Sequence, residues 1–179
     1  MRTAIDNLYL YDPQFEAGAK KFIAEMGGSS AMRPIRSASD IANCLKEFVL
    51  VKFLVFDTHG SPGKIWLANG RAFEGIDFIT MSQNTQFLAK DARVLFLGCN
   101  LAEGSPGDTF LSDIGKFLLR GKGGTVGATT VPNVTFQIGS YSSEAFMMPL
   151  SFGRLKVKRY AATGDEVGSM TTDRHGWSR

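Results

Sequence analysis

Two nearly continuous apolar runs constrain the fold of this chain more than any other feature of its sequence. Residues 49–56 are apolar except for Lys52, and residues 93–97 read RVLFL. A strand with one face in water alternates polar and apolar residues, whereas continuous apolar runs are typical of parallel strands buried on both faces. The two runs therefore predict central strands of a mainly parallel sheet.

The segments around these runs alternate between strand and helix patterns. We expect further strands over 7–11, 124–128 and 134–138, a hairpin from 65–67 and 71–73, helices that begin at Pro13 and at Ser37 or Ser39, helices over 77–89 and 106–119, and a loop over 29–37. This order predicts an α/β fold of three layers, with a mainly parallel sheet flanked by helices.

The end of the chain has a different pattern. In residues 154–160 (RLKVKRY), Leu155 and Val157 alternate with basic residues, which is typical of an edge strand with one wet face. The sequence after Thr163 is polar, as chain ends without fixed structure often are. We therefore expect an α/β domain over 1–162 that ends in a basic edge strand, and a polar C-terminal tail over 163–179.

Length and composition exclude several classes of protein. The 179 residues fit one domain, and 44% hydrophobic with 21% charged residues is ordinary for a globular chain. A net charge of +3 gives no argument for nucleic acid binding, and no apolar run reaches the roughly 18 residues of a membrane span. The N-terminal stretch becomes acidic before a signal-peptide core forms, so we expect a cytoplasmic location or delivery without such a signal.

A reactive side chain follows each of the two apolar runs. The first run continues as DTHG and places His59 just beyond the strand, and the second continues as GCN and places Cys99 there. Catalytic groups of open parallel sheets gather at the carboxyl ends of strands. Because only a thiolate attacks well, a cysteine nucleophile needs a base such as imidazole beside it. If the two strands are neighbours, His59 and Cys99 form a catalytic dyad, with the backbone N–H groups of Gly60 and Cys99 as an oxyanion hole.

Two longer segments, DTHGSPGKIWLANG and LFLGCNLAEGSPGDTFLSDIG, resemble the caspase-like (clan CD) cysteine peptidase superfamily over residues 50–130. The sequence of these segments is most similar to a bacterial branch of domains without assigned function, and more distantly to the self-cleaving cysteine protease domains of bacterial toxins. The resemblance implies a caspase-like fold and a cysteine endopeptidase. His59 would be its general base and Cys99 its nucleophile, without a required cofactor. Its substrate would be a protein or peptide, with its own chain as one candidate, cleaved through a thioester.

The resemblance also implies a specificity pocket and an activator. The pocket would be shaped by Leu97, Gly98 and the stretch 129–132, with Thr129 and Thr130. None of these is charged, so an apolar or small substrate side chain is expected. In the toxin domains a basic flap binds inositol hexakisphosphate, which makes such a polyanion a candidate activator here. A solvated edge strand that uses lysine to block aggregation is the favoured reading of the same residues.

Other readings of these residues stay open. A lone cysteine or histidine is more often a structural residue than a catalytic one. Asp57 either orients His59 or serves as a structural turn residue, and the structural role is favoured. Cys44, on a predicted helix, is read as structural, and no cluster has the spacing of metal ligands. The alternative functions are a catalytically silent interaction module and a thiol-dependent enzyme that acts on another substrate. The sequence does not set the oligomeric state.

Overall fold

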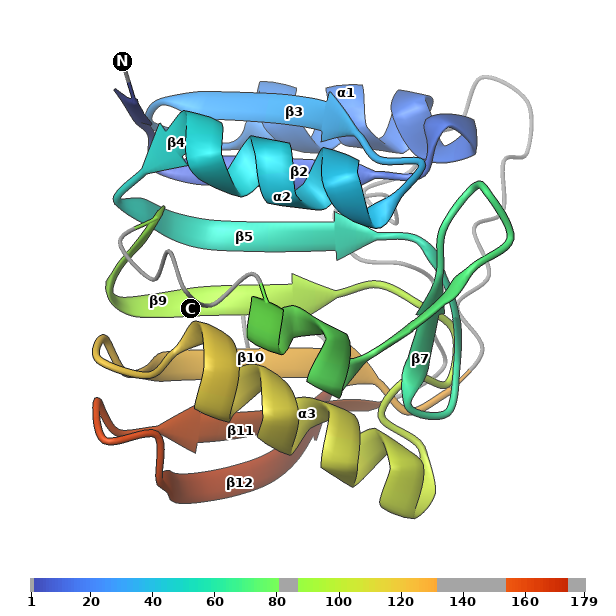
Figure 1. Cartoon of the computed structure of the whole chain (residues 1–179), viewed down its shortest axis with the longest axis vertical. Helices are drawn as coiled ribbons and strands as arrows, with labels where there is room; N and C mark the ends of the chain where they lie inside the picture. Colours follow the sequence, from blue (N-terminus) through green and yellow to red (C-terminus); the bar gives the residue numbers. More distant parts are fainter. Residues whose placement is uncertain (1, 81–86, 132–153, 174–179) are drawn as a thin grey trace.

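The computed structural model describes residues 2–80, 87–131 and 154–173 (Figure 1). Its elements, in chain order, are β1 (Thr3–Ala4), β2 (Asn7–Tyr11), the 3₁₀ helix η1 (Pro13–Phe15), α1 (Glu16–Glu25), β3 (Ser30–Pro34), α2 (Ala38–Glu47), β4 (Phe48–Val49), β5 (Val51–Asp57), β6 (His59–Ser61), β7 (Lys64–Trp66), β8 (Ala72–Glu74), the 3₁₀ helix η2 (Gly75–Thr80), β9 (Leu88–Phe96), α3 (Gly104–Leu118), β10 (Gly124–Thr129), β11 (Arg154–Tyr160) and β12 (Glu166–Asp173). Within these ranges no helix combines the length and apolar character needed to cross a membrane.

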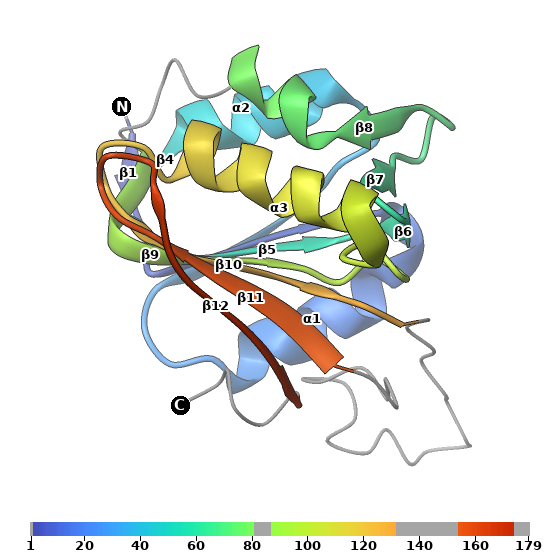
Figure 2. The same ribbon diagram turned by 90° about the horizontal axis from the view of Figure 1, so that it is seen from below.

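A seven-stranded sheet in the order β12-β11-β10-β9-β5-β2-β3 forms the middle layer. The five strands from β10 to β3 run parallel, and β11 and β12 are antiparallel to their neighbours. Helix α1 covers one face of the sheet, and α2, η2 and α3 lie on the other (Figure 2). The prediction of an α/β fold with a mainly parallel sheet flanked by helices is confirmed.

Aromatic side chains fill the layer between the sheet and helix α3. Phe56 of β5 and Phe96 of β9 stack at 4.7 Å, and Phe110 of α3 meets the Phe96 ring edge-on at 5.0 Å. Phe78 of η2 contacts all three rings and is fully buried. Because side chains alternate along a strand, Val55 points to the opposite face, toward α1. The apolar runs are therefore central strands buried on both faces, as their sequence predicts.

Two local signals in the sequence have clear structural counterparts. Ser37 begins α2 through a capping box with Asp40, so Ser37 rather than Ser39 is the cap. The run 49–56 is not one strand, because Leu50 has a left-handed backbone (φ 57°) and is 55% exposed. This residue separates β4, which pairs with β1, from β5 in the main sheet.

Three other predicted segments differ from the structure or lie outside it. The expected loop 29–37 contains the edge strand β3, which is held by its backbone pairing with β2. Since most of its side chains are half-exposed, the segment has no apolar pattern in the sequence. The expected helix 77–89 begins within the 3₁₀ helix η2, residues 81–86 lie outside the described residues, and its predicted end was wrong because Leu88 already belongs to β9. The expected strand 134–138 lies outside the described residues.

The prediction of a basic edge strand over 154–160 was wrong in its position. The segment is β11, but it lies between β10 and β12. Its alternation arises because Val157 packs toward α1, while Lys156 and Lys158 form ion pairs with Asp108 of α3. The true edge is β12, so the predicted tail contributes a strand and the sheet extends beyond residue 162. Its side chains are largely exposed, and a polar strand held by backbone pairing has little sequence signal.

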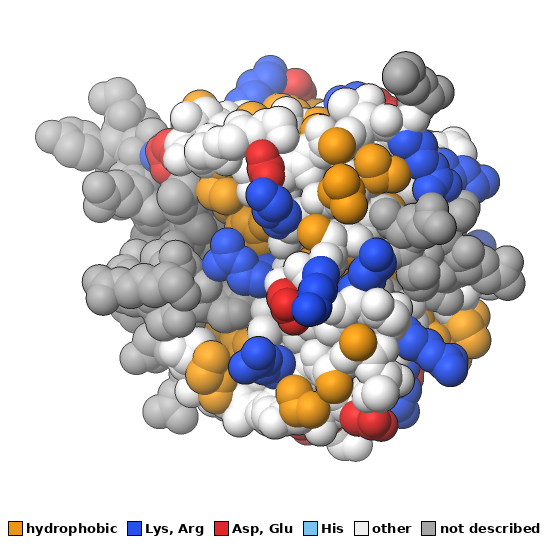
Figure 3. Space-filling view, turned by 90° about the vertical axis from the view of Figure 1, so that its left-hand side faces the viewer, with side chains coloured by type: hydrophobic (Ala, Val, Ile, Leu, Met, Phe, Trp, Pro, Cys, Tyr) orange, Lys and Arg blue, Asp and Glu red, His pale blue; other side chains and the backbone are white. Residues whose placement is uncertain are grey.

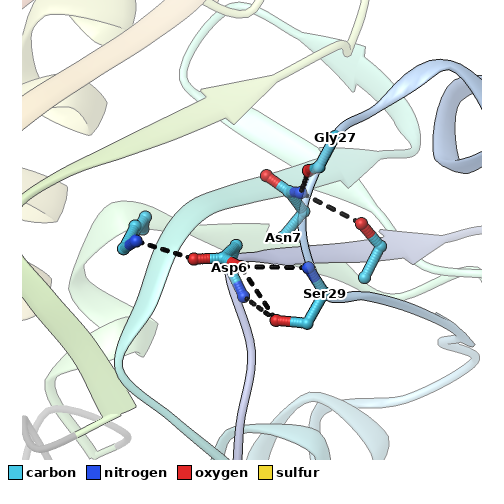
Figure 4. A network of polar contacts seen from close by, with 6 residues as sticks. Asp6, Asn7, Gly27 and Ser29 are labelled. Carbon is cyan, nitrogen blue, oxygen red and sulfur yellow. Dashed lines mark hydrogen bonds and ion pairs between the residues drawn. The ribbon is translucent and has the colours of Figure 1, made fainter.

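A network of polar side chains lies at the amino ends of the parallel strands. Asp6 forms an ion pair with Lys52 at 2.7 Å and accepts hydrogen bonds from the backbone N–H and the hydroxyl of Ser29, both at 2.9 Å (Figure 4). The Asn7 amide donates to the Gly27 carbonyl oxygen at 2.9 Å. Lys and Arg side chains are scattered over this end of the molecule between apolar and acidic ones (Figure 3).

Candidate active site

The strands that precede His59 and Cys99 are neighbours. β5 and β9 pair in parallel, with Phe56 opposite Phe96, and the Leu97 N–H donates to the Phe56 carbonyl oxygen at 2.8 Å. Their arrowheads point the same way in Figure 1, and the chain leaves both strands at one edge of the sheet. The adjacency on which the predicted dyad depends is therefore present.

A close backbone contact joins the two segments beyond the strands. A Cβ atom built on Gly60 would lie 2.7 Å from the carbonyl carbon of Gly98 and 2.8 Å from the backbone nitrogen of Cys99. Glycine allows this approach because it has no side chain. His59 precedes Gly60 and is exposed, and Cys99 follows Gly98 and is partly exposed. Solvent can therefore reach both residues.

The close backbone contact determines where the imidazole and the thiol can meet. Catalytic hydrogen bonds are often long without substrate and shorten when it binds. The geometry thus brings the backbones of the two residues together at one edge of the sheet.

The His59 side chain contacts the 3₁₀ helix η1, which follows β2. The Gln14 side-chain amide hydrogen-bonds to Nε2 of the imidazole, and the Phe15 ring meets the imidazole edge-on at 5.2 Å. An open hollow of about 640 Å³ adjoins the imidazole; its walls include Asp12, Gln14 and the half-exposed Trp66. The site therefore has a concave surface on the η1 side of His59.

The loop that carries Cys99 is tied to its surroundings by backbone bonds. The Asn100 N–H donates to the Val131 carbonyl oxygen at 3.0 Å, and the Ala102 N–H donates to that of Thr129 at 2.8 Å. Asn100 has a left-handed backbone (φ 52°). Its Oδ1 atom and the Oγ1 atom of Thr58 are buried and have no hydrogen-bond partner among the described residues. Two unsatisfied polar atoms thus lie beside the residues of the predicted dyad, as is common at functional sites.

The residues predicted to shape a specificity pocket are mostly internal. Leu97 is 8% exposed and packs in the cluster that faces α1, and Thr129 is 1% exposed and donates from its hydroxyl to the Gly98 carbonyl oxygen. Gly98 is buried against Gly60, Thr130 and Val131 are half-buried, and residue 132 lies outside the described residues. The Leu97 and Thr129 side chains support the Cys99 loop and do not line an open pocket.

Asp57 is the partner of a tyrosine. The Tyr9 hydroxyl donates to Oδ2 of Asp57 at 2.8 Å across strands β2 and β5, and the Asp57 side chain is partly buried. Burial raises the pKa of Asp57 to about 7, opposed by the Tyr9 hydrogen bond and assisted by the charge of Asp12. Burial likewise raises the pKa of Tyr9. These contacts support the structural role for Asp57 rather than contact with His59.

The second cysteine, Cys44, is chemically unlike an activated thiol. It is buried on α2, and burial, with a smaller contribution from Glu47, raises its pKa to about 11. A thiol in such surroundings is inert. Cys44 therefore serves as an internal control for the reactivity of Cys99.

The basic strand proposed to bind a polyanion has much of its charge neutralised. Lys156 forms an ion pair with Asp108 at 2.6 Å, and Lys158 pairs with Asp108 at 3.3 Å and Glu166 at 3.0 Å. Lys158 is only 7% exposed. These contacts lower the positive potential that β11 offers to an anion. Among the described residues, no group of His, Cys, Asp or Glu side chains is placed to hold a metal ion.

Gln14 and Phe15 were missed as candidate site residues. The sequence places them at a helix start, and neither residue type carries catalytic chemistry. The one available signal is positional: β2 is parallel to β5, with Tyr11 opposite Asp57, so the chain leaves β2 at the same edge as it leaves β5.

The fold and the site together define a mixed α/β protein that brings an imidazole and a thiol to the carboxyl edge of a parallel sheet. The chain belongs to the family described as "Domain of unknown function (DUF4347)", whose model matches residues 31–125. The matched segment contains both His59 and Cys99. No curated protein and no solved structure matches the chain.

Proposed function

We propose that the protein is a caspase-like cysteine endopeptidase with a dyad of His59 and Cys99. The observation that carries the proposal is the contact of Gly60 with Gly98 at the ends of the parallel strands β5 and β9. It holds an exposed imidazole and a partly exposed thiol on adjoining backbones, as acyl transfer by a cysteine requires. The motif resemblance and the parallel sheet support the caspase-like assignment.

The chemistry proceeds in two steps. His59 takes the Cys99 thiol proton, and the thiolate attacks a peptide carbonyl carbon to give a tetrahedral oxyanion. The backbone N–H groups of Gly60 and Cys99 are the proposed donors to this oxyanion. The C–N bond then breaks, and the imidazolium protonates the leaving amine. Water, deprotonated by His59, hydrolyses the thioester and releases the carboxylic acid and the Cys99 thiol.

The test compares wild type with Cys99→Ala, His59→Ala and the matched control Cys44→Ala. Each protein is treated with a peptide-derived electrophile and analysed by intact mass, with self-cleavage scored in the same samples. We expect one adduct on wild type and Cys44→Ala, none on Cys99→Ala, and labelling slowed about tenfold or more in His59→Ala. Labelling that persists in Cys99→Ala, or that is unaffected in His59→Ala, would contradict the proposal and favour a silent interaction module.

A further inference from the structure

We propose that Gln14 is a positioning residue for His59. Its side-chain amide holds Nε2 of the imidazole and leaves Nδ1 to exchange a proton with Cys99. The inference rests on the proposed dyad and adds to it a residue that contacts neither the thiol nor the substrate. It is carried by the hydrogen bond between the Gln14 amide and His59 Nε2.

The helix that presents Gln14 is fixed in place. Oδ1 of Asp12 accepts a hydrogen bond from the Gln14 N–H at 3.1 Å, which caps the start of η1. The Asp12 N–H in turn donates to the Asp57 carbonyl oxygen at 2.8 Å, two residues before His59. The Gln14 amide is therefore anchored, through Asp12, to the strand that leads into His59.

A second contact from the same helix restricts the ring. Phe15 meets the imidazole edge-on at 5.2 Å, so η1 touches His59 through two consecutive residues. Such pairs of rings favour defined relative orientations. Together the amide and the phenyl ring limit rotation of an imidazole that is otherwise exposed.

The chemistry of the amide selects one protonation state. A glutamine amide turns about its last bond and can present either its oxygen or its NH₂ group. The structure places the amide nitrogen at Nε2, and we take the amide as turned by half a rotation about that bond. Presenting the oxygen, it accepts a bond from Nε2–H, which leaves the lone pair of the neutral ring on Nδ1. The same bond stabilises the imidazolium formed when Nδ1 takes the thiol proton.

The charged groups around His59 do not replace this contact. From η1, the Asp12 carboxylate caps Gln14, and from β5 the Asp57 carboxylate accepts from Tyr9. On β7, Lys64 forms an ion pair with Glu74 at 2.9 Å. Cys99 approaches from the β9 side through its backbone. Gln14 thus makes a direct hydrogen bond to the ring that none of these charged groups provides.

The first measurement is nuclear magnetic resonance of protein labelled with ¹⁵N-histidine, for wild type, Gln14→Leu and Gln14→Glu. The chain's other histidine is assigned with a His175→Gln variant. We expect a hydrogen-bonded Nε2–H proton on His59 in wild type and Gln14→Glu, and its loss by exchange with water in Gln14→Leu. A neutral ring protonated at Nδ1 in wild type, or a signal unchanged in Gln14→Leu, would overturn the inference.

The second measurement is the rate at which iodoacetamide alkylates Cys99 in a Cys44→Ala background. Loss of the bond to the imidazolium should slow alkylation up to about tenfold in Gln14→Leu, and Gln14→Glu should restore the rate. Because Gln14 is exposed, all variants should share the thermal unfolding midpoint of wild type. An equal rate in wild type and both variants, where Cys99 of wild type reacts faster than a free thiol, would also overturn the inference.

The two measurements separate the inference from the function on which it rests. If Cys99 is activated but neither signal nor rate depends on Gln14, the dyad stands and the role of Gln14 is refuted. If the Nε2–H signal depends on Gln14 while Cys99 reacts no faster than a free thiol in every variant, the amide orients His59 but the proposed peptidase is refuted.

Discussion

The backbone of Gly60 lies against the backbone of Gly98, so closely that neither position has room for a side chain. A Cβ atom on Gly60 would meet both the Cα and the carbonyl carbon of Gly98 at 2.7 Å, and one on Gly98 would meet the Gly60 Cα at 3.0 Å. This contact links the strand that begins with His59 to the loop that carries Cys99. It therefore sets the distance between the two proposed catalytic residues.

Gly60→Ala should separate these segments and destabilise the fold. Because the methyl group would meet backbone rather than a flexible side chain, we expect the free energy of unfolding to fall by about 1–3 kcal/mol. Alkylation of Cys99 should also slow, because its loop moves away from His59. Urea unfolding and alkylation under native conditions measure the two effects.

Gly27→Ala is the matched control for this substitution. No atom lies within 4 Å of a Cβ built on Gly27. We expect its free energy of unfolding to stay within about 0.5 kcal/mol of wild type. Equal stability of the Gly60 and Gly27 variants would show that the backbone contact is not tight in solution.

The pair of Tyr9 and Asp57 predicts a specific dependence of stability on pH. Burial raises the pKa of Asp57 to about 7 in the folded protein, above the usual value near 4 of an unfolded chain. Between these two values the folded state binds more protons than the unfolded state. Stability therefore decreases as pH rises through this window, and the loss is complete above pH 7.

Asp57→Asn removes this titration and keeps an oxygen that can accept from the Tyr9 hydroxyl. Between about pH 4 and pH 8, we expect the free energy of unfolding of the variant to rise relative to that of wild type by a few kcal/mol. Each pKa unit corresponds to about 1.4 kcal/mol. Urea unfolding at a series of pH values measures the difference. A difference in free energy of unfolding between variant and wild type that stays constant across this pH range would show that Asp57 does not titrate as described.

The sequence predicts well those parts of the fold in which burial determines the type of residue at each position. The apolar runs before His59 and Cys99 are the central strands β5 and β9, because a strand buried on both faces needs apolar residues at every position. The cap of α2 at Ser37 is equally local. These features require no knowledge of the rest of the chain.

The part that could not be predicted depends on contacts distant in the sequence. Strands β3 and β12 are held by backbone bonds at the edges of the sheet and have exposed or half-exposed side chains, so no pattern marks them. The contact of Gln14 with His59 spans 45 residues and depends on β2 lying next to β5. The position of β11 could not be predicted for the same reason, since its lysines resemble a wet face until Asp108 covers them.

Lys158 connects three elements, and its removal should destabilise the sheet at β11. Its ammonium group lies 3.3 Å from Asp108 and from the Ser112 hydroxyl on α3, and 3.0 Å from Glu166 on β12. Lys158→Met keeps most of the aliphatic length and removes these bonds. We expect the free energy of unfolding, measured with urea, to fall by about 1–2 kcal/mol. The loss is no larger because the exposed carboxylates regain water.

The exposed ion pair of Lys20 and Glu16 on α1 is the control for the substitution of Lys158. It has a similar distance of 2.8 Å, but the Lys20 side chain is 66% exposed. Lys20→Met should cost less than about 0.5 kcal/mol, as is usual for such surface pairs. A cost for Lys158→Met no larger than for Lys20→Met would show that the buried lysine adds nothing to the cohesion of β11.

The network around Asp6 predicts a stabilising contribution that disappears in acid. The ion pair with Lys52, and then the bonds from Ser29, lower the pKa of Asp6 from 3.8 to about 2. A depressed pKa means that the ionised carboxylate stabilises the fold at pH values above the unfolded pKa, and that this contribution is lost as pH falls through 2. Asp6→Asn should therefore lower the unfolding midpoint at neutral pH, by an amount that shrinks between about pH 4 and pH 2.

Lys52→Met provides the reciprocal change for a double-mutant cycle with Asp6→Asn. Since the two residues share one ion pair at 2.7 Å, their effects on the unfolding midpoint should not add at neutral pH. The effects should become additive at about pH 2, where the Asp6 carboxylate takes up its proton. Additive effects at neutral pH would mean that the ion pair joining the amino ends of β2 and β5 does not form in solution. A midpoint difference that persists unchanged in acid would mean that Asp6 acts through its shape rather than its charge.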